Sequence, residues 1–493
     1  MKTHINISLQ KWCAVGVLST LIFASSCKKS FLDVDPQGQQ AAQQFWKTQE
    51  DATKGVNAIY ANLRTWENLA FPALAIESTG SDEADKGSTV TDATFFNLYD
   101  TFTVTSTEGS LQSFWTGQYR NINLCNQVLD NIPNISMDAS LKARYLAEAK
   151  FVRAYSYFRL VRAYGGVPLR LKVPADATEY NIPRADKAAV YAQIEKDLTE
   201  AAAVLPASYG TSDIGRATKG AAIGMHAKVA MYQQKWNDVL SLTNQVMDMG
   251  YSLFPDFEKG FRTQNENNVE SLFEVQCEFV PGNNDASNSQ YSQVQGVAGE
   301  PAGGWGFNTP SAVLIAAFET GDPRKDATIL FPGETTPQGD FIKTNVVNIG
   351  YNQKSYVPFS MFVSGNQGSQ QNFRVLRFAD ILLMNAEAAN ELNNPSLALT
   401  SLNKVRARAR GTATGILPDV TTTDKVALRA AIYKERQVEL ALESDRLFDV
   451  IRQGRGVEVF GVKGFKANKN EVWPIPQTEI DLSGGLLTQN PGY

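Results

Sequence analysis

Residues 377–411 have the sequence RFADILLMNAEAANELNNPSLALTSLNKVRARARG, which predicts two antiparallel helices joined by a tight turn. Apolar residues recur at helical spacing in both halves, so each helix has a face that must pack against other structure. Asn394 is suited to cap the second helix and Pro395 to open it, because proline lacks only an N–H that has no partner in the first turn. Gly411 marks the end of that helix. A fold built from helical pairs is therefore expected.

The same helical pattern recurs through the rest of the chain. Further helices are expected at residues 51–63, 110–132, 141–169, 187–205, 217–232, 236–249 and 425–454. Such pairs resemble tetratricopeptide units, although the usual 34-residue repeat is degraded. The stretches 64–108 and 265–371 lack sustained periodicity, so we predict long surface loops there, with a strand at 271–279. The sequence thus predicts a mainly α protein with four helical pairs, an irregular loop-rich part and a few short strands.

The first 26 residues have the features of an export signal. Lys2 and Lys11 precede the apolar run 12–24, which is too short to span a bilayer. Small residues stand directly before Cys27, as in the lipobox of bacterial lipoproteins, so we expect Cys27 to become the acylated first residue. An ordinary signal peptide that ends near a cysteine is the alternative.

Charge and composition exclude several classes of function. Removal of the signal leaves 44 basic and 51 acidic residues, a net charge of −7, which argues against nucleic acid as a partner. The basic group at 404–410 is expected to be a solvated, ion-paired helix face. Only Cys125 and Cys277 remain beside Cys27, too few for a disulfide framework. One histidine, His226, remains in the mature chain and is expected to pack, so zinc sites built on several histidines are excluded.

Two acidic groups are weighed as sites of chemistry. Glu435 and Glu439 lie four residues apart and share a helix face, as a pair of catalytic carboxylates can. Acidic and basic residues at 443, 446, 449 and 452 alternate at the spacing of intrahelical ion pairs, which favours a structural charge network instead. The acidic stretch 81–87 does not have the spacing of a calcium loop, and a solvated turn is the favoured interpretation. We predict no catalytic residue, no metal site and no cofactor.

The tryptophans separate by context into packing residues and ligand candidates. Packing is expected for four that lie at helix starts, on an apolar stripe or near the C-terminus: Trp46, Trp115, Trp236 and Trp473. Trp66 and Trp305 lie in the two irregular stretches instead. Exposed aromatic planes with nearby amides suit the C–H faces and hydroxyl edges of sugars. The ligand-binding candidates are Trp66, Asn68, Phe71, Tyr291 and Trp305, with pinning of loops to the body as an equally weighted alternative.

Several phrases resemble the SusD/RagB lipoproteins of Bacteroidetes, in the order expected for that family. They are FLDVDP after Cys27, FWKT at 45–48, AEAKFVRAYSYFRLVRAYGGVPL at 147–169, LRFADILLMNAEA at 376–388, LNKVRARA at 402–409, and the C-terminal stretches 425–454 and 473–493. The resemblance divides the chain into a signal peptide at 1–26, an N-terminal part at 27–264 and a C-terminal part at 265–493, the last two forming one compact unit.

The resemblance also implies a function. It predicts a non-enzymatic lipoprotein, anchored in the outer membrane through Cys27 and facing the cell exterior. Such a protein captures an oligosaccharide or similar nutrient and delivers it to a SusC-like TonB-dependent transporter. A surface glycoside hydrolase and a helical-repeat scaffold that binds only proteins remain as alternatives.

Overall fold

The computed structural model describes residues 45–493 except 177–178, 279–287, 300, 345 and 362–367. The predicted lipidation site Cys27 and the export signal lie outside the described residues. Within the described part of the chain, no helix combines the length and the apolar character needed to cross a membrane.

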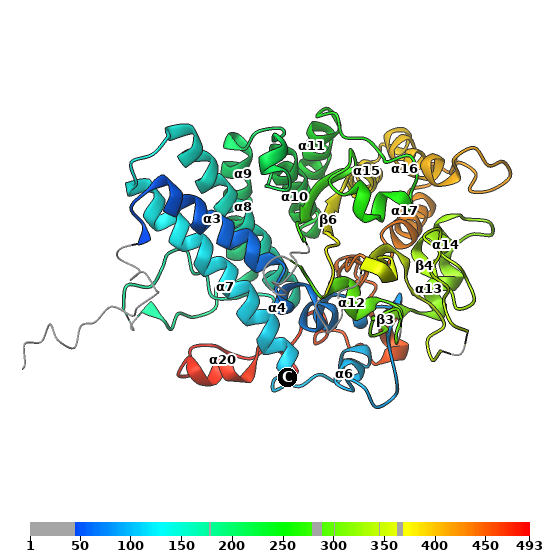
Figure 1. Cartoon of the computed structure of the whole chain (residues 1–493), viewed down its shortest axis with the longest axis horizontal. Helices are drawn as coiled ribbons and strands as arrows, with labels where there is room; N and C mark the ends of the chain where they lie inside the picture. Colours follow the sequence, from blue (N-terminus) through cyan, green and yellow to red (C-terminus); the bar gives the residue numbers. More distant parts are fainter. Residues whose placement is uncertain (1–44, 177–178, 279–287, 300, 345, 362–367) are drawn as a thin grey trace, which may run out of the picture.

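Nine long helices of the described chain form the helical part of the molecule (Figure 1). They are α3 (Gln49–Leu63), α7 (Gly109–Asn131), α8 (Ala139–Tyr164), α9 (Lys187–Val204), α10 (Lys219–Tyr232), α11 (Trp236–Met247), α15 (Phe378–Glu391), α16 (Pro395–Arg410) and α17 (Lys425–Glu439). Contacts join them in pairs, α3 with α7, α8 with α9, α10 with α11 and α15 with α16. Successive pairs also touch, through α7 with α8, α9 with α10 and α11 with α15. The predicted tetratricopeptide-like scaffold of helical pairs is confirmed.

Local signals set the ends of these helices. The Asn394 side chain accepts a hydrogen bond from the Leu397 N–H at 3.2 Å, and Pro395 occupies the first turn of α16. Gly411 follows α16 with a φ of 56°, a conformation that glycine adopts without strain. At the end of α8, Gly165 has a φ of 73° and closes the helix. The helical run 141–169 therefore ends at the glycine and proline residues 165, 166 and 168, where the sequence predicts the stop.

Three two-stranded antiparallel sheets lie beside the helices. β1 (Ala84–Gly87) pairs with β3 (Phe307–Pro310), β2 (Ser271–Val275) with β6 (Phe373–Arg377), and β4 (Ile329–Leu330) with β5 (Tyr351–Asn352). β2 confirms the predicted strand and ends four residues before residue 279. The β1–β3 pair joins the two irregular stretches, because β1 belongs to the first and β3 to the second.

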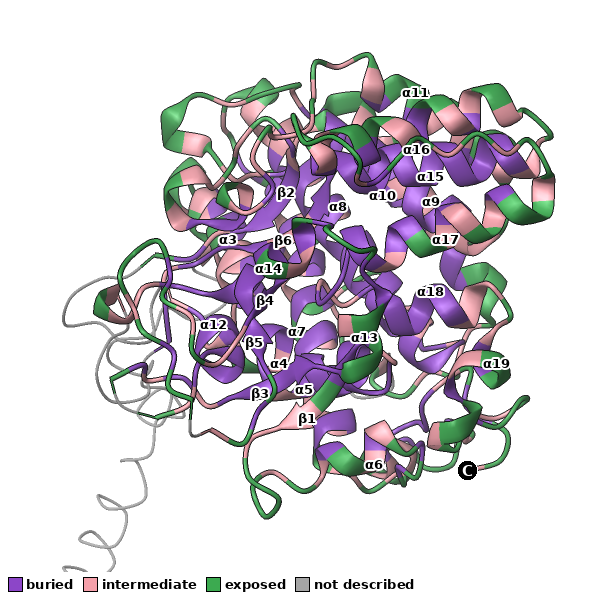
Figure 2. Ribbon diagram, turned by 90° about the vertical axis from the view of Figure 1, so that its right-hand side faces the viewer, coloured by how far each residue is buried: buried purple, intermediate pink, exposed green. Residues whose placement is uncertain are grey.

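The prediction that residues 64–108 and 265–371 are long surface loops is wrong. Both stretches contain short elements, namely α4 (Trp66–Leu69), α5 (Phe71–Leu74), a π-helix (Ala75–Thr79), α6 (Phe96–Asp100), α12 (Tyr291–Gln295), α13 (Ala312–Ala317) and α14 (Arg324–Thr328). Many of their residues are buried, as the purple ribbon at β3 and β5 shows (Figure 2). Polar side chains in these stretches are buried in hydrogen bonds with one another, so a polar composition did not indicate exposure here.

The predicted continuous helix at 425–454 is also divided. α17 ends at Glu439, and α18 (Arg446–Arg452) begins after a turn in which Leu442 and Ser444 have φ values of 61° and 67°. Two short helices follow before the C-terminus, α19 (Gly456–Phe460) and α20 (Gln477–Leu482). Helical periodicity continues across the turn, so the sequence pattern alone does not reveal it.

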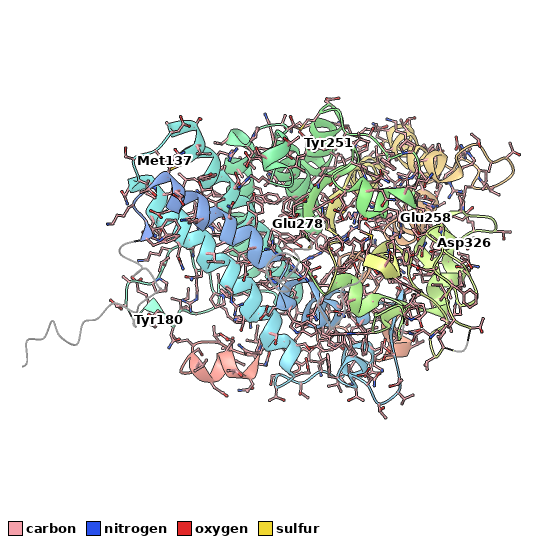
Figure 3. All side chains as sticks on the ribbon, viewed as in Figure 1. Met137, Tyr180, Tyr251, Glu258, Glu278 and Asp326 are labelled. Carbon is pink, nitrogen blue, oxygen red and sulfur yellow. The ribbon has the colours of Figure 1, made fainter. Side chains whose placement is uncertain are left out.

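One large hydrophobic cluster runs from Ala52 to Leu487 and so draws on both ends of the described chain. Side chains fill the space between the helical and the irregular parts (Figure 3). Trp115 and Trp473 are buried as predicted, and the Trp473 indole N–H donates to the Ile76 carbonyl at 3.0 Å. Cys125 and Cys277 are free and buried. The core size of a long chain, rather than crosslinks, therefore stabilises the described fold.

The close approach after α8 gives a test of this packing. A Cβ added at Gly166 would lie 2.3 Å from the Ala185 carbonyl oxygen, on a segment held by the Ala185 N–H to Val167 carbonyl bond. We expect Gly166→Ala to lower the free energy of unfolding by about 1–3 kcal/mol, because backbone atoms must move apart. Urea denaturation followed by circular dichroism measures the change.

Gly109→Ala is the matched control for this experiment. Gly109 opens α7, and an added Cβ there meets no heavy atom within 4 Å. Alanine favours a helix over glycine, so stability should stay equal or rise by up to about 1 kcal/mol. Equal stability of the two variants would contradict the close packing at Gly166.

Candidate functional site

An aromatic cluster on the irregular part of the molecule brings three of the predicted ligand residues together. The ring centroids of Trp66 and Phe71 are 5.1 Å apart, those of Trp66 and Trp305 6.1 Å, and those of Phe71 and Trp305 5.7 Å. Trp66 is 36% exposed, and Phe71 and Trp305 are half-buried. We call these three rings the aromatic platform.

Further phenylalanines lie against the platform. Phe71 packs edge-on against Phe96 at 5.0 Å and against Phe307 at 4.8 Å. Phe95 is half-buried and stacks on Phe96 at 4.7 Å. Phe96 and Phe307 are buried, so the platform rests on rings that belong to the core. Such edge-to-face and offset contacts fix the orientation of each ring.

The glycines on both sides of Trp305 fix the main chain that carries it. A Cβ at Gly304 would lie 2.4 Å from the main chain of Gly296, so only glycine permits this approach. The Gly306 carbonyl accepts from the Ser88 N–H at 2.7 Å and from Asn348 Nδ2 at 3.0 Å. The Gly-Trp-Gly sequence is thus a structural turn, and the same turn presents the tryptophan at the surface.

A lysine lies beside one of the phenylalanines that support the platform. Lys86 Nζ lies 5.7 Å from the centroid of the Phe307 ring and donates to the Thr89 and Asp92 carbonyls. Burial lowers the pKa of Lys86. An aromatic surface with a cation at its edge can stack a sugar ring and donate to its oxygens.

Two predicted ligand residues, Asn68 and Tyr291, do not reach this surface. Asn68 is buried, and its Oδ1 accepts from Gln118 Nε2 at 2.7 Å while its Nδ2 donates to the Asn62 carbonyl at 2.8 Å. α4 has a single turn, so Trp66 and Asn68 lie on different sides of it. Tyr291 is 6% exposed and packs on Phe373 at 5.0 Å, and burial raises its pKa to about 12. Both side chains belong to the interior.

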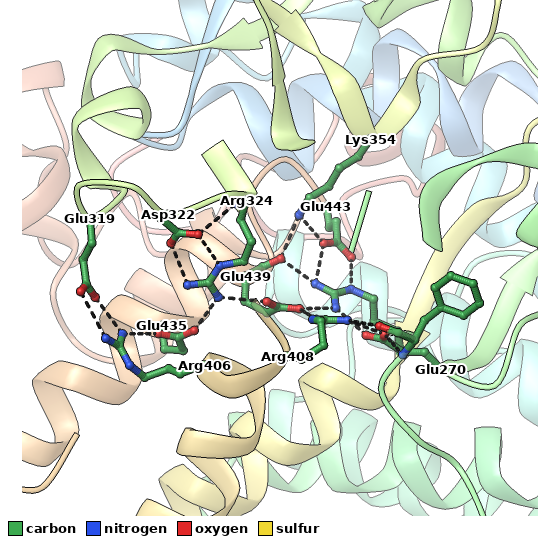
Figure 4. A network of polar contacts seen from close by, with 12 residues as sticks. Glu270, Glu319, Asp322, Arg324, Lys354, Arg406, Arg408, Glu435, Glu439 and Glu443 are labelled. Carbon is green, nitrogen blue, oxygen red and sulfur yellow. Dashed lines mark hydrogen bonds and ion pairs between the residues drawn. The ribbon is translucent and has the colours of Figure 1, made fainter. Parts of the chain in front are cut away.

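The acidic pair Glu435 and Glu439 lies inside a buried ion network (Figure 4). Glu439 is fully buried, and its two oxygens pair with Arg377 at 2.6 Å and with Arg324 at 3.0 Å. Arg408 also pairs with Glu439. Burial alone would raise the pKa of Glu439, but the three guanidinium groups hold it well below its usual range.

The same network includes Glu435 and two residues of the basic group at 404–410, Arg406 and Arg408. Glu435 pairs with Arg324 and, at 2.9 Å, with Arg406. Because Glu435 and Glu439 are buried and bound to arginines, neither is placed to reach a bond in a bound ligand. The prediction of a solvated basic face at 404–410 is wrong for Arg406 and Arg408, whose side chains are nearly buried within the network.

The predicted intrahelical ion pairs are formed in part. Asp449 and Arg452 pair at 2.7 Å within α18. Glu443 instead pairs with Arg377 and Lys354, while Arg446 binds Asp82 at 2.7 Å. The interruption between α17 and α18 removes the helical spacing between Glu443 and Arg446. Arg446 and Asp449 keep that spacing within α18, but Arg446 binds Asp82 instead, and Asp449 binds Arg436 and Arg452.

The prediction of a solvated turn at 81–87 is wrong, because Ser81, Glu83 and Ala84 are buried and residues 84–87 form β1. Asp82 binds Arg446, and Glu83 is buried where desolvation raises its pKa to about 8. Among the described residues, no group of three or more His, Cys, Asp and Glu is arranged to hold a metal ion. His226 is half-buried on α10, and burial lowers its pKa.

Comparisons with known proteins match nearly the whole chain. A family model described as the SusD family matches residues 269–493, and one described as starch-binding and associating with the outer membrane matches residues 30–231. SusD-like protein P2 of Formosa agariphila is 28% identical over 97% of this chain and 98% of its own length.

Solved structures agree with these matches. A laminarin-binding SusD-like protein is 29% identical, with a TM-score of 0.80 over 91% of this chain and 100% of its own. A SusD-like protein from Bacteroides fragilis is 26% identical, with a TM-score of 0.77 over 92% of this chain and 99% of its own.

Breaking the ion network should destabilise the protein. Glu439→Gln keeps the shape of the side chain but leaves three guanidinium groups without their shared carboxylate. We expect the free energy of unfolding at neutral pH to fall by about 3–5 kcal/mol. The folded-state pKa of Glu439 is depressed, so its contribution is present above the ordinary value of 4.5 and is lost as the pH falls. The difference between variant and wild type, measured by urea denaturation, should therefore shrink in acid.

The control is a glutamate in an exposed pair. Glu50 binds Lys54 at 2.8 Å on the surface of α3. Glu50→Gln should leave the urea midpoint unchanged, because exposed pairs contribute little. A Glu439→Gln variant as stable as Glu50→Gln would show that the network does not support the fold.

Proposed function

The chain belongs to the SusD/RagB family, and on that premise we propose that it binds an oligosaccharide at the cell surface through the aromatic platform. The observation that carries the proposal is the meeting of Trp66 and Trp305. They come from two stretches more than 200 residues apart, and their rings lie 6.1 Å from each other, partly exposed. Trp115 and Trp473, in contrast, are buried in the core.

The chemistry of the platform suits a sugar chain. Pyranose rings present C–H faces to aromatic planes and hydroxyl edges to polar groups at the rim. Three tilted rings form a surface along which successive sugar units can lie. The related laminarin-binding protein is named for a β-glucan, so laminarin is the first ligand to test.

We further propose that the protein delivers its ligand to a SusC-like TonB-dependent transporter and has no catalytic activity of its own. The support for this partner is family membership. The buried and ion-paired state of Glu435 and Glu439 removes the carboxylate pair on which a surface glycoside hydrolase would have relied. A helical-repeat scaffold that binds only proteins would have no need of the exposed rings at the platform.

Outer-membrane association is supported by the description of the family model that matches residues 30–231. We propose that the anchor is an acylated Cys27, exposed after removal of residues 1–26, and that the protein faces the cell exterior. The parts 27–264 and 265–493 are proposed to act as one unit, since the platform takes Trp66 from the first and Trp305 from the second.

Substitution of the platform tryptophans tests the ligand site. Trp66→Ala and Trp305→Ala should each weaken laminarin-oligosaccharide binding about tenfold, or about 1.4 kcal/mol, because each removes one stacking face. Isothermal titration calorimetry measures the affinities, and a thermal melt confirms that each variant is folded.

Phe341→Ala is the control, since Phe341 is an exposed aromatic residue of a separate hairpin, 55% accessible to solvent. It should leave affinity unchanged. If laminarin fragments do not bind, an array of glycans compared between wild type and the two tryptophan variants identifies the ligand. Equal retention of every glycan by folded Trp66→Ala, Trp305→Ala and wild type would refute this placement of the site.

The anchor is tested by labelling with palmitate in cells. Cys27→Ala should incorporate no label and should be recovered away from the outer-membrane fraction, because the acyl chains provide the attachment. Cys13→Ala is a matched control within the export signal, and it should be labelled as wild type is. Undiminished labelling of Cys27→Ala would contradict acylation at this residue.

A further inference from the structure

A second pocket lies on the other side of α7 from the platform. Its volume is about 280 Å³, near the lower end of the range for small-molecule sites. It is lined by the N-terminal half of α7, by the C-terminal helix α20 with residues just after it, and by Pro168, Arg170, Asn181 and Ile182. In Figure 1, α4 and α20 lie on opposite sides of this half of α7.

The floor of the pocket is aromatic and apolar. Trp115 and Tyr119 lie one helical turn apart on α7 with ring centroids 5.0 Å apart. The Tyr119 hydroxyl donates to the Pro168 carbonyl at 2.8 Å, which fixes the ring beside a residue that also lines the pocket. Leu482 of α20 is 68% exposed at the edge. Trp115 is only 3% exposed and packs at a tilt against Tyr119, so the half-buried Tyr119 ring is the aromatic surface that a sugar ring can contact.

Two arginines bring positive charge to the lining of the pocket. The Arg120 side chain is 51% exposed, and the carboxylate it approaches is that of Glu67 at 3.8 Å. Arg170 donates to the main-chain carbonyls of Glu179 and Tyr180. Among the described residues, no carboxylate lies within ion-pair distance of Arg170. Both guanidinium groups therefore keep donors and charge that an anionic group can use.

The pocket also offers acceptors. Glu479 of α20 accepts from Gln112 Nε2 at 2.7 Å, and no lysine or arginine of the described chain pairs with it. The exposed amide of Asn181 also lines the pocket. The lining thus combines a carboxylate and an amide, which suit hydroxyl groups, with two guanidinium groups, which suit an anionic group.

The pocket is connected to the platform by direct packing. A Cβ at Gly117 of α7 would lie 2.7 Å from the Glu67 Cβ, so α4 rests on α7 without an intervening side chain. Glu67 follows Trp66 in sequence and approaches Arg120, which lines the pocket. Trp66 and the pocket are thus neighbours across α7.

We propose that this pocket binds an acidic sugar unit, one that carries a carboxylate or a sulfate, in a chain held at the same time by the aromatic platform. The inference rests on the proposed glycan-binding function and adds the class of ligand. A neutral sugar would stack on the floor but would leave the charges of Arg120 and Arg170 unused. Charge-assisted hydrogen bonds are about twice as strong as neutral ones, so the anionic group sets the preference.

Saturation-transfer NMR on the whole protein tests the pocket with single sugar units. The probes are methyl glucuronide, methyl glucoside 6-sulfate and methyl glucoside. We expect at least one anionic glycoside to bind about tenfold more tightly than the neutral one, and the anionic preference to weaken as salt increases. Which of the two anions binds better distinguishes a uronate from a sulfate ester.

Variants separate this site from the platform. Arg120→Ala combined with Arg170→Ala should abolish the anionic preference, and Trp66→Ala should retain it, because the pocket does not include the indole. Lys196→Ala removes an exposed charge on α9 and should behave as wild type. A thermal melt shows whether each variant is folded.

Several results would overturn the inference. Equal binding of neutral and anionic glycosides would do so, as would an anionic preference that survives in the folded double-arginine variant. Displacement by inorganic phosphate without saturation of the sugar-ring protons would show a site for bare anions instead. Loss of oligosaccharide binding in Trp66→Ala tests the platform alone, so the pocket and the proposed function can fail independently.

Discussion

The fold depends on a buried carboxylate, Glu439, that is shared by arginines from several separate segments. Arg377 is the last residue of β6, directly before α15, Arg408 lies on α16, and Arg324 belongs to α14 in the irregular part. Removing a charge from water costs several kcal/mol, and only well-placed partners offset that cost. The network is therefore stable when all of these segments are in position, and it disfavours arrangements in which the irregular part is displaced from the helices. The network thus fixes the position of the irregular part relative to the helices.

The ion network also helps to position the aromatic platform. α14 and Lys354 belong to the second irregular stretch and are joined to the network, while β3 of the same stretch pairs with β1 of the first. This pairing places the turn that carries Trp305 beside the segment that carries Trp66 and Phe71. Neither stretch forms the site alone. The helical scaffold thus fixes two distant segments relative to each other, and in the proposed function it does so without touching the ligand.

Much of the fold follows from signals within a few residues of each helix end. The features that the sequence does not predict depend on contacts between distant residues. Asn394 and Gly411 define α16 through bonds and dihedral angles within a few residues, so its limits follow from the sequence. The break after Glu439 does not, because the partners of Glu443 and Arg446 are Arg377 and Asp82. Each partner is more than 60 residues distant.

The same contrast applies to the candidate site. Trp66 and Trp305 were selected because they lie outside any helical stripe, and the structure brings them together. Asn68 was selected for its proximity in sequence, but Gln118 and Arg159 hold it in the interior. Arg120 and Arg170 are not among the predicted site residues, since nothing in their own sequence context indicates a pocket formed with α20.

The positive charges of Arg120 and Arg170 belong to a chain whose net charge is negative. At physiological salt the Debye length is about 8 Å, so the distant acidic groups are largely screened while Arg120 and Arg170 act at contact distance. Glu67 and Glu479 also lie at the pocket, so the proposed selection of an anionic unit depends on its direct contact with the two guanidinium groups and not on the net charge of the chain.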